Sequence, residues 1–237
     1  MLKKLSDAER DNDHIYAVIR GFAANHNGFR SNSLASPSSD GQTEVIVKAI
    51  QNAGVNPENI GLIETHGTGT NIGDPIEIKG LSDAFHQFTE KRAFCSLGAV
   101  KSNFGHAGIC AGAVGLLKAV ASLSLKKRYP IANYHQPNRL IDFENSPFYP
   151  QSTLDHWEQS GIRTAGVSSL GLSGTNVFGI LTEYPQQKPE AETASTDVFS
   201  ISAASEDALQ RYKAVLASKI AQSSDSVKAL CAAMNYG

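Results

Sequence analysis

One local pattern occurs twice in this chain and restricts its fold more than any other feature. An apolar run at 60–63 leads into a Gly/Thr loop that contains His66. A second apolar run at 94–100 leads into a loop that contains His106, and a helix pattern follows each loop. Strands that alternate with helices are typical of layered α/β domains. We therefore expect an α/β domain with His66 at the end of a strand and His106 at the start of a helix.

Further elements follow from hydrophobic periodicity and turn-forming residues. Apolar alternation predicts a strand over 13–21, and a polar loop comes next at 25–39. The remaining predictions are a helix over 43–53 that ends at Gly54, a helix with Asp74 as its N-cap and Pro75 as its first residue, and two strands over 163–168 and 177–184 joined as a hairpin. With the two histidine segments, these elements describe one domain that closes near residue 185.

The run at 107–125 is long and weakly polar enough to raise the question of a membrane span. It consists mostly of Ala, Gly and Ser, and it contains Lys118. A charge near the middle of a bilayer is costly, whereas a helix in a protein core accepts small residues readily. We therefore expect a buried core helix here.

Charge and cysteine content argue against several classes of function. The formal net charge is -2, and Lys and Arg are spread along the chain, so neither nucleic acid nor a membrane surface is an expected partner. Cys95, Cys110 and Cys231 are odd in number and lack CxxC spacing, which disfavours a disulfide framework and a metal site. The first residues also lack the apolar region of a secretory signal. A cytoplasmic location fits best.

The end of the chain differs in composition from the rest. Residues 186–197 are polar and contain Pro189, as expected of a linker. Beyond them, 198–202 predicts a short strand, and Ser205 can cap a helix that continues through Ile220. We expect this tail to begin a second unit.

The glycines after the first strand invite comparison with nucleotide-binding loops. Gly67 and Gly69 match the first two glycines of the dinucleotide fingerprint, but Ile72 stands where the third belongs. The Gly-Lys-Ser/Thr triplet of a P-loop does not occur in the sequence. Nucleotide binding is therefore not expected.

His66 and His106 are the candidate catalytic residues. Each lies in a glycine-containing loop, where backbone can approach a ligand closely. A lone histidine is more often structural than catalytic. His106 precedes a helix, however, and the positive end of a helix keeps an imidazole neutral and able to donate a hydrogen bond to a developing oxyanion. The residues alone leave the reaction open.

Four segments, taken in order, resemble the β-ketoacyl synthases of polyketide and multifunctional fatty acid synthases. They are 64–70 (ETHGTGT), 73–77 (GDPIE), 101–107 (KSNFGHA) and 166–176 (GVSSLGLSGTN). The resemblance begins in the strand that ends at Gly21 and reaches Tyr184, and the tail resembles the start of the linker between a ketosynthase and an acyltransferase domain. It implies the C-terminal half of a thiolase-like fold, layered α/β/α, over 1–185, a linker over 186–197, and the start of a small α/β linker region over 198–237.

In this family two histidines and a cysteine form the active site, and the histidines correspond to His66 and His106. The resemblance implies that they stabilise the enolate formed when a malonyl or methylmalonyl thioester loses carbon dioxide. Lys101, Glu77 and Asp74 match positions that support the histidines. The pair Lys101 and Glu77 would otherwise be read as surface charges.

Other positions carried over from the resemblance concern substrate. Residues of the last motif match the loop that gates the acyl pocket and lends a backbone N–H to an oxyanion hole, namely Gly171, Leu172, Ser173, Gly174 and Thr175. Thr68 and Thr70 match substrate-binding positions. Leu172 stands where many members have Phe, and 177–179 (VFG) replaces the usual Ala-His-Val.

The implied activity is decarboxylative condensation of an extender held on an acyl carrier protein, by an acyltransferase of the 3-oxoacyl synthase type. The carrier's phosphopantetheine arm would be the substrate carrier, with no cofactor bound to the chain itself. The implied partners are that carrier, a cysteine-bearing N-terminal half and a second copy in a dimer. A non-catalytic partner or fragment that completes or regulates a separate half is the alternative, and a thiolase-like enzyme that uses free coenzyme A is less favoured.

The nucleophile of the family has no counterpart here. It belongs to a Thr-Ala-Cys-Ser-Ser type turn, and the sequence contains no such segment. Cys95 and Cys110 lie in apolar segments, where a free cysteine is usually part of the core and has a raised pKa. The chain alone is therefore expected to be inactive in condensation.

We predict that the purified chain stays unacylated when it is incubated with an acyl thioester. Acyl transfer needs an accessible thiolate, and the expected core cysteines do not provide one. Intact-protein mass spectrometry measures the result. A stoichiometric adduct on Cys95 or Cys110 that passes its acyl group to a malonyl-derived carbanion would contradict the prediction.

Overall fold

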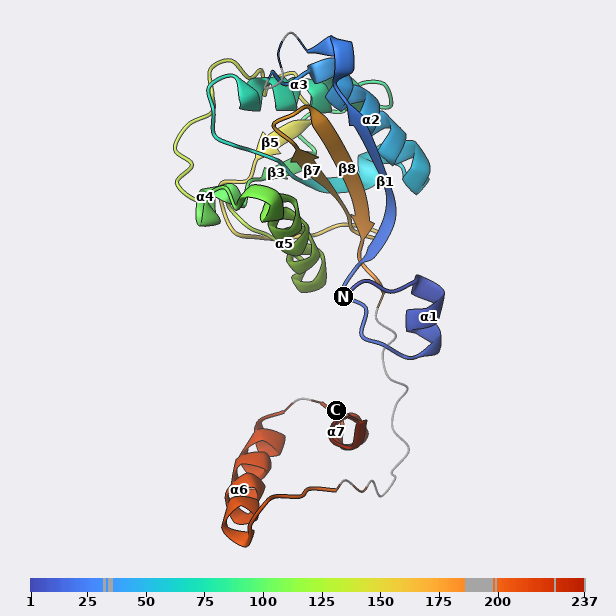
Figure 1. The fold of residues 1–237 in the computed structure, drawn as a ribbon, viewed down its shortest axis with the longest axis vertical. Helices are drawn as coiled ribbons and strands as arrows, with labels where there is room; N and C mark the ends of the chain where they lie inside the picture. Colours follow the sequence, from blue (N-terminus) through green and yellow to red (C-terminus); the bar gives the residue numbers. More distant parts are fainter. Residues whose placement is uncertain (32, 34–35, 186–197, 199, 224, 237) are drawn as a thin grey trace. The chain divides into compact units, whose positions relative to one another are not determined.

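The computed structural model describes residues 1–31, 33, 36–185, 198, 200–223 and 225–236. It consists of two compact units, Met1–Gln186 and Gln187–Gly237 (Figure 1). The larger unit contains a six-stranded sheet with helices on both faces. The expected linker over 186–197 lies outside the described residues.

A mixed, mostly parallel sheet organises the larger unit. The strand order is β1-β8-β7-β2-β3-β5, with bounds Val18–His26, Thr175–Thr182, Thr164–Leu170, Ile60–Glu64, Cys95–Gly98 and Phe148–Pro150. Strand β2 pairs in parallel with β3 and β7, and β3 pairs in parallel with β5. Strand β8 runs antiparallel to both of its neighbours. The predicted hairpin is thus confirmed as β7 and β8.

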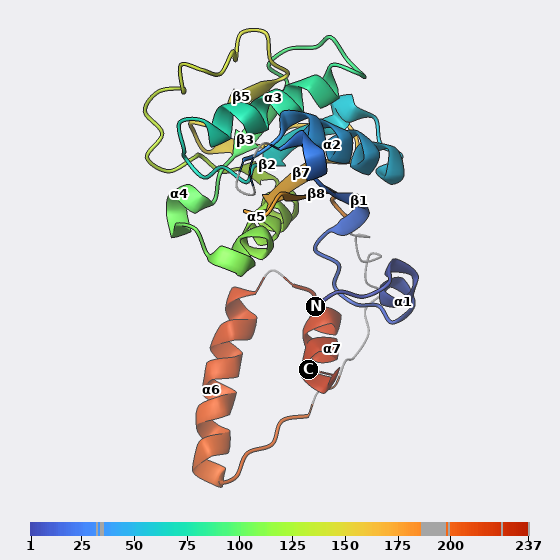
Figure 2. The same ribbon diagram turned by 45° about the horizontal axis from the view of Figure 1, so that its top comes forward.

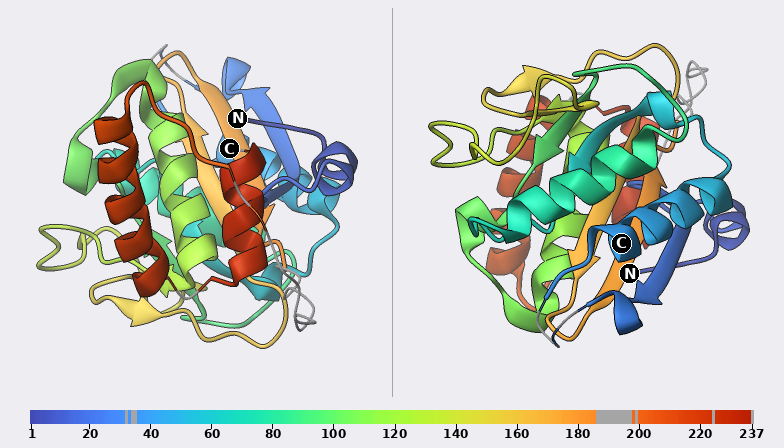
Figure 3. Two further views of the ribbon diagram at one scale, coloured as in Figure 1. Left: turned by 90° about the horizontal axis from the view of Figure 1, so that it is seen from below. Right: turned by 90° about the horizontal axis from the view of Figure 1, so that it is seen from above.

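Helices cover the two faces of this sheet unequally. Helices α2 (Ser39–Ala53) and α3 (Gly73–Phe85) lie on one face, and α5 (Ala111–Leu125) lies on the other (Figures 2 and 3). The remaining elements of the larger unit are α1 (Leu5–Arg10), α4 (Lys101–Phe104), the two-stranded sheet of β4 (Lys127–Arg128) and β6 (Asp155–His156), and the 3-10 turns Gly28–Arg30, Pro57–Asn59 and Gly108–Cys110. This is the layered α/β arrangement that the sequence predicts.

Each face of the sheet has its own apolar cluster. One cluster joins the sheet to α2 and α3 and includes Ile50, Ile63 and Phe85. The other joins the sheet to α5 and includes Leu123 and Trp157. Because strands alternate their side chains between faces, both clusters draw on the same strands. The sheet is therefore held from both sides.

Helix α2 has well-defined ends that its sequence explains. The Ser38 hydroxyl accepts a hydrogen bond from the backbone N–H of Gly41 at 3.2 Å, which caps the first turn. Gly54 ends the helix in the left-handed conformation, with φ of 61°. The predicted helix over 43–53 is confirmed and begins earlier, at Ser39.

Two predicted boundaries are wrong. The strand expected over 13–21 is β1, which runs from Val18 to His26 because its pairing with β8 continues to His26. Asp74 is not the N-cap of α3, because the helix already begins at Gly73 and Ile72 stands at the N-cap position without a side-chain cap bond. The Asp74 carboxylate instead accepts the backbone N–H of Gly69 at 3.1 Å.

The expectation of a buried core helix over 107–125 holds for one face of α5 only. Only the stripe of α5 that faces the sheet is buried, whereas Leu117 and Leu125 and the preceding Ile109 are exposed. In the part of the chain that the structure describes, Gly108–Leu125 is the one helical stretch long and apolar enough to cross a membrane. The composition correctly predicted an apolar helix. It does not indicate which face of that helix packs against the sheet and which face is exposed.

The smaller unit contains the helices α6 (Glu206–Gln222) and α7 (Val227–Tyr236). The Ser205 hydroxyl accepts the N–H of Ala208 at 3.2 Å, which confirms the predicted cap. The strand expected over 198–202 is absent from the described residues of that segment. The Asn235 side chain instead accepts the N–H of Ser200 at 3.2 Å and donates to the carbonyl of Val198 at 2.9 Å.

We predict that Gly21→Ala destabilises the fold. A Cβ at Gly21, on β1, would lie 2.6 Å from the backbone nitrogen of Ala53 on α2, so the strand and helix would have to separate. The expected loss is about 1–3 kcal/mol in the free energy of unfolding, measured by urea denaturation.

Gly179→Ala is the matched control, because Gly179 lies on the neighbouring strand β8 and a Cβ there meets nothing within 4 Å. It should change stability by less than about 1 kcal/mol. Equal losses in the two variants would show that close packing of β1 on α2 is not the cause.

Candidate functional site

Three parallel strands bring the candidate residues to one edge of the sheet. His66 follows β2, Lys101 follows β3, and the turn over 171–175 follows β7. Since β2 pairs in parallel with β3 and β7, the three strands end at the same edge. The rings of His66 and His106 meet there edge to face, with centroids 5.6 Å apart. The two predicted histidines thus form one cluster.

The His66 ring is held through its Nδ1 atom. The backbone N–H of Leu170 donates to Nδ1 at 3.3 Å, and the Lys101 ammonium also lies 3.3 Å from it. Both partners are donors, so Nδ1 acts as the acceptor and the proton of the neutral ring is on Nε2. The Lys101 ammonium also donates to the carbonyl oxygen of His66. His66 thus presents an N–H from Nε2.

His106 has the same tautomer for a similar reason. The backbone N–H of Gly108 donates to Nδ1 of His106 at 3.0 Å, so its neutral ring also carries the proton on Nε2. Residues 103–110 are all exposed. Two neighbouring imidazoles that each offer an Nε2–H can bind one developing negative charge.

Glu77 fixes the backbone on either side of the His66 ring. Its buried carboxylate accepts the N–H of His66 at 2.7 Å and the N–H of Gly67 at 2.9 Å. The ion pairs among the described residues do not join Glu77 to Lys101, so the two support His66 separately rather than as a bonded pair. Burial raises the pKa of Glu77 and lowers the pKa of Lys101.

The other predicted supporting and substrate-binding residues lie along the loop that follows His66. Asp74 binds Gly69 as described, and burial raises the pKa of its carboxyl. The hydroxyls of Thr68 and Thr70 lie 3.2 Å apart and belong to exposed residues. This loop is therefore held by hydrogen bonds among its own neighbouring residues, and Thr68 and Thr70 are exposed to solvent.

The predicted gate forms the tight turn between β7 and β8. The N–H of Gly171 donates to the carbonyl of Thr175 at 2.7 Å, and Gly174 has φ of 94°, which favours glycine. His26, at the end of β1, contacts the carbonyl of Ser173 at 2.7 Å. The side chain of Leu172 is 83% exposed. The turn is thus anchored at its base while Leu172 projects outward.

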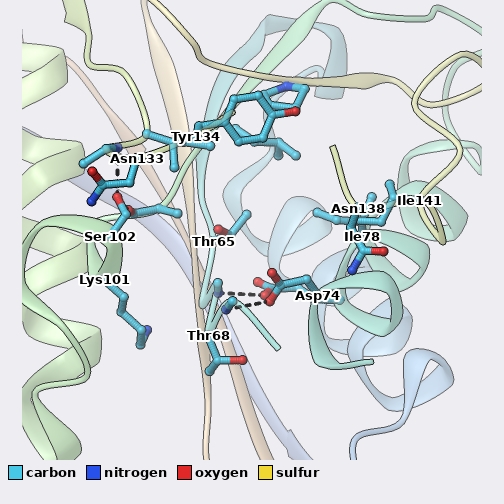
Figure 4. Close-up of a pocket in the computed structure, with 18 of the residues that line it drawn as sticks. Thr65, Thr68, Asp74, Ile78, Lys101, Ser102, Asn133, Tyr134, Asn138 and Ile141 are labelled. Atoms are coloured by element: carbon cyan, nitrogen blue, oxygen red, sulfur yellow. Dashed lines mark hydrogen bonds between the residues drawn. The ribbon is translucent and has the colours of Figure 1, made fainter. Parts of the chain in front are cut away.

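A cavity of about 300 Å³ lies beside the histidines rather than between them. Lys101 and Ser102 line one side, and Asp74, Ile78 and Asn138 line another (Figure 4). Neither histidine lines it, whereas Lys101 contacts both the His66 ring and this cavity. Sequence reasoning missed part of its wall, because loop residues carry no periodic signal. The missed lining residues are Ile131, Ala132, Asn133, Tyr134, Asn138, Ile141 and Phe143.

Sequence reasoning also missed Glu64 and Lys118. Glu64 belongs to the first of the four motifs, yet its side chain is fully buried and lies 3.0 Å from the Lys118 ammonium. An acidic residue in an apolar strand and a lysine in an apolar helix were the available signals. Only the fold reveals that they form a pair.

The cysteines agree with expectation in one case and not in the other. Cys95 is buried, and burial raises the pKa of its thiol well above the usual range. Cys110 is exposed, contrary to the expectation of a core position, because it ends the 3-10 turn before the outer face of α5. Low reactivity of Cys110 therefore cannot be attributed to burial.

Two family models match the chain. "Beta-ketoacyl synthase, C-terminal domain" matches residues 16–135, and "Ketoacyl-synthetase C-terminal extension" matches 137–235. The chain belongs to the β-ketoacyl synthase family. Both matches agree with the resemblance found from the four motifs and with the thiolase-like fold.

Polyketide synthases are among the proteins similar to this chain. Polyketide synthase PksL of Bacillus subtilis is 43% identical over 213 residues, which cover 86% of this chain and 5% of that protein. A mycocerosic acid synthase-like polyketide synthase of Mycolicibacterium smegmatis is 40% identical over 236 residues, which cover 94% of this chain and 11% of that protein. This chain therefore corresponds to a small part of each relative.

Solved ketosynthases have the same fold. The ketosynthase from module 1 of the bacillaene synthase from Bacillus amyloliquefaciens has a TM-score of 0.84 and 36% identity, covering 98% of this chain and 42% of that one. The ketosynthase from module 6 of the bacillaene synthase from Bacillus subtilis has a TM-score of 0.79 and 37% identity, covering 94% and 39%. The chain is thus a C-terminal ketosynthase portion that spans about two fifths of those structures.

The electrostatics of this ketosynthase portion favour a neutral His66. Burial, the Lys101 ammonium and His106 lower the pKa of His66 from 6.5 to about 4. His66 binds a proton more readily in the unfolded chain than in the folded chain. The lowered pKa therefore reduces the free energy of unfolding as the pH falls from 6.5 toward 4. Above pH 6.5 both states are neutral and the shift has no effect.

We predict that His66 remains a neutral Nε2–H tautomer at about pH 5.5, where a histidine of ordinary pKa is mostly protonated. Nitrogen-15 NMR of histidine-labelled ketosynthase chain measures both tautomer and titration. The same label in urea-unfolded chain is the control and should titrate near the ordinary value. A folded-state midpoint for His66 near 6.5 would contradict the prediction.

Proposed function

We propose that His66 and His106 catalyse decarboxylation of a malonyl-type thioester in a polyketide ketosynthase. The observation that carries this proposal is that both Nδ1 atoms accept backbone N–H groups, which leaves two neighbouring Nε2–H donors. Donors already fixed in place lower the barrier to a step that creates negative charge nearby.

The chemistry requires two donors on one thioester oxygen. Breaking the bond between the extender's carboxylate and its α-carbon releases carbon dioxide and leaves an enolate, whose oxygen receives both Nε2–H bonds. The α-carbon then attacks an acyl thioester, a carbon–carbon bond forms, and the cysteine leaves as a thiolate that takes up a proton. Lys101 and Glu77 would hold the His66 ring and backbone through these steps.

The cysteine would come from an N-terminal half outside this chain. The outer face of α5 exposes Leu117 and Leu125, and Phe22 of β1 is exposed on the same side of the sheet because its neighbours Gly21 and Ala23 face α2. Several large apolar side chains exposed on one side of a sheet are typical of an interface. Solved ketosynthases are more than twice as long, so a second half of suitable size exists in the family.

The remaining roles follow from the family and from exposure. An acyl carrier protein would deliver the extender on its phosphopantetheine arm, and the exposed Thr68 and Thr70 would bind that arm. Gly171, Leu172, Ser173, Gly174 and Thr175 would gate the acyl pocket and supply an oxyanion N–H. A dimer of complete ketosynthases in the cytoplasm is the expected setting. We place the activity with the acyltransferases of the 3-oxoacyl synthase type.

We predict that His66→Ala or His106→Ala lowers decarboxylation of malonyl carrier protein by about 100- to 1,000-fold in a ketosynthase assembled with its cysteine-bearing half, the usual cost of one lost oxyanion donor. Carbon dioxide release measures the rate. Acylation of the cysteine by an acyl carrier protein should remain measurable, because it does not require the enolate site.

His135→Ala is a suitable control, since His135 is an exposed loop residue outside the cluster. It should retain the parental rate. If a His66→Ala/His106→Ala double variant also retains that rate, decarboxylation is not the role of the pair, and the alternative of a non-catalytic partner is favoured.

A further inference from the structure

Glu64 is a charged residue in the core that the decarboxylation chemistry does not use. It is the last residue of β2, two positions before His66, and its side chain is fully buried. A buried carboxylate is costly unless charges and hydrogen bonds compensate it. Burial raises the pKa of Glu64, and the positive charge of Lys118 lowers it by a smaller amount. A charge retained here requires a physical reason.

The two oxygens of Glu64 reach the two segments that carry the other site residues. Oε1 accepts the backbone N–H of Val100 at 2.5 Å, directly before Lys101 and α4. Oε2 lies 3.0 Å from Nζ of Lys118, on the helix that follows the His106 loop. One side chain on β2 is thus tied to the segments on both sides of His106.

Gly98 leaves space for this ion pair, whereas Gly115 is only in ordinary contact distance of it. A Cβ at Gly98, on β3, would lie 2.4 Å from Oε2 of Glu64 and 3.0 Å from Nζ of Lys118. A Cβ at Gly115, on α5, would lie 3.5 Å from Cγ of Glu64. A larger residue at Gly98 would therefore displace the ion pair, so a glycine at this position of β3 is what allows the pair to form.

We propose that Glu64 and Lys118 are positioning residues that fix the spacing between His66, Lys101 and the His106 loop. The proposal rests on the decarboxylation function proposed above. A buried ion pair contributes little net stability compared with apolar residues of the same size, so stability alone does not account for it. Two opposite charges that approach to 3.0 Å in one arrangement of β2 and α5 favour that arrangement over others.

The test uses Glu64→Gln and Lys118→Met in the assembled ketosynthase. Each should lower kcat for decarboxylation by about 10- to 100-fold, the range that displacement of a catalytic group by about 1 Å produces. KM for the malonyl thioester should change little, because neither residue contacts substrate. Lys118→Arg keeps the charge and should retain most of the activity.

A second arm separates positioning from folding. The double variant Glu64→Gln/Lys118→Met leaves no unpaired buried charge, so its Tm should return toward that of the parent while kcat stays low. Histidine NMR of the chain itself should register displaced His66 ring resonances in Glu64→Gln. A merely structural role would not move these resonances in the folded protein.

The ion pair of Arg163 and Glu183 is the matched control. Its side chains are 14% and 15% exposed, its N···O distance is 2.9 Å, and it lies at the start of β7, the end away from the histidines. Arg163→Met should lower the Tm and leave kcat and the His66 resonances unchanged. An equal effect on kcat would overturn the proposal.

The remaining outcomes distinguish the two proposals. If Glu64→Gln and Lys118→Met keep the parental kcat while His66→Ala loses it, the positioning role is overturned and the decarboxylation function stands. Recovery of kcat together with Tm in the double variant also overturns the positioning role. If His66→Ala keeps the parental rate, the decarboxylation function itself fails.

Discussion

The parallel pairing of β2 with β3 and β7 is the constraint on which the rest of this structure depends. Strands that run in the same direction deliver their following loops to one edge of the sheet, where open α/β sheets place their sites. The contacts made there are distant in sequence, since 35 residues separate His66 from Lys101 and 104 separate it from Leu170. Sheet register, rather than any local turn, decides which groups meet.

At that edge the protein uses backbone groups to set the chemistry of side chains. Backbone N–H groups occupy Nδ1 of both histidines, and a buried carboxylate holds the N–H groups around His66. Backbone donors have little freedom to move, so tautomer and ring orientation are fixed before substrate arrives. The low pKa of His66, about 4, follows from the same burial and from the nearby ammonium of Lys101. The neutral ring that the proposed decarboxylation needs is thus a property of the resting fold.

The helix layer formed by α5 is less completely buried than the layer formed by α2 and α3. Helices α2 and α3 cover their face of the sheet, and most of their apolar residues are buried. Helix α5 buries one stripe and leaves another open beside the exposed loop over 103–110. Because the apolar stripe and the candidate active site share this side, a partner that covers α5 would also enclose the histidines. Exclusion of water there would strengthen every electrostatic contact in the site.

The sequence by itself determined the alternation of strands and helices, the β7–β8 hairpin and the cap at Ser205, and it pointed to the two histidines that the fold brings together. These features depend on local periodicity, turn chemistry and motif residues. The sequence misplaced β1 and the start of α3, since pairing with β8 and the N–H of Gly69 compete with local preference. The tautomer of His106 depends on a local bond from the N–H of Gly108. Only the tertiary structure decided the tautomer of His66, the exposed face of α5 and the pairing of Glu64 with Lys118. These depend on which groups approach across the sheet, and that distance is not encoded in any short segment.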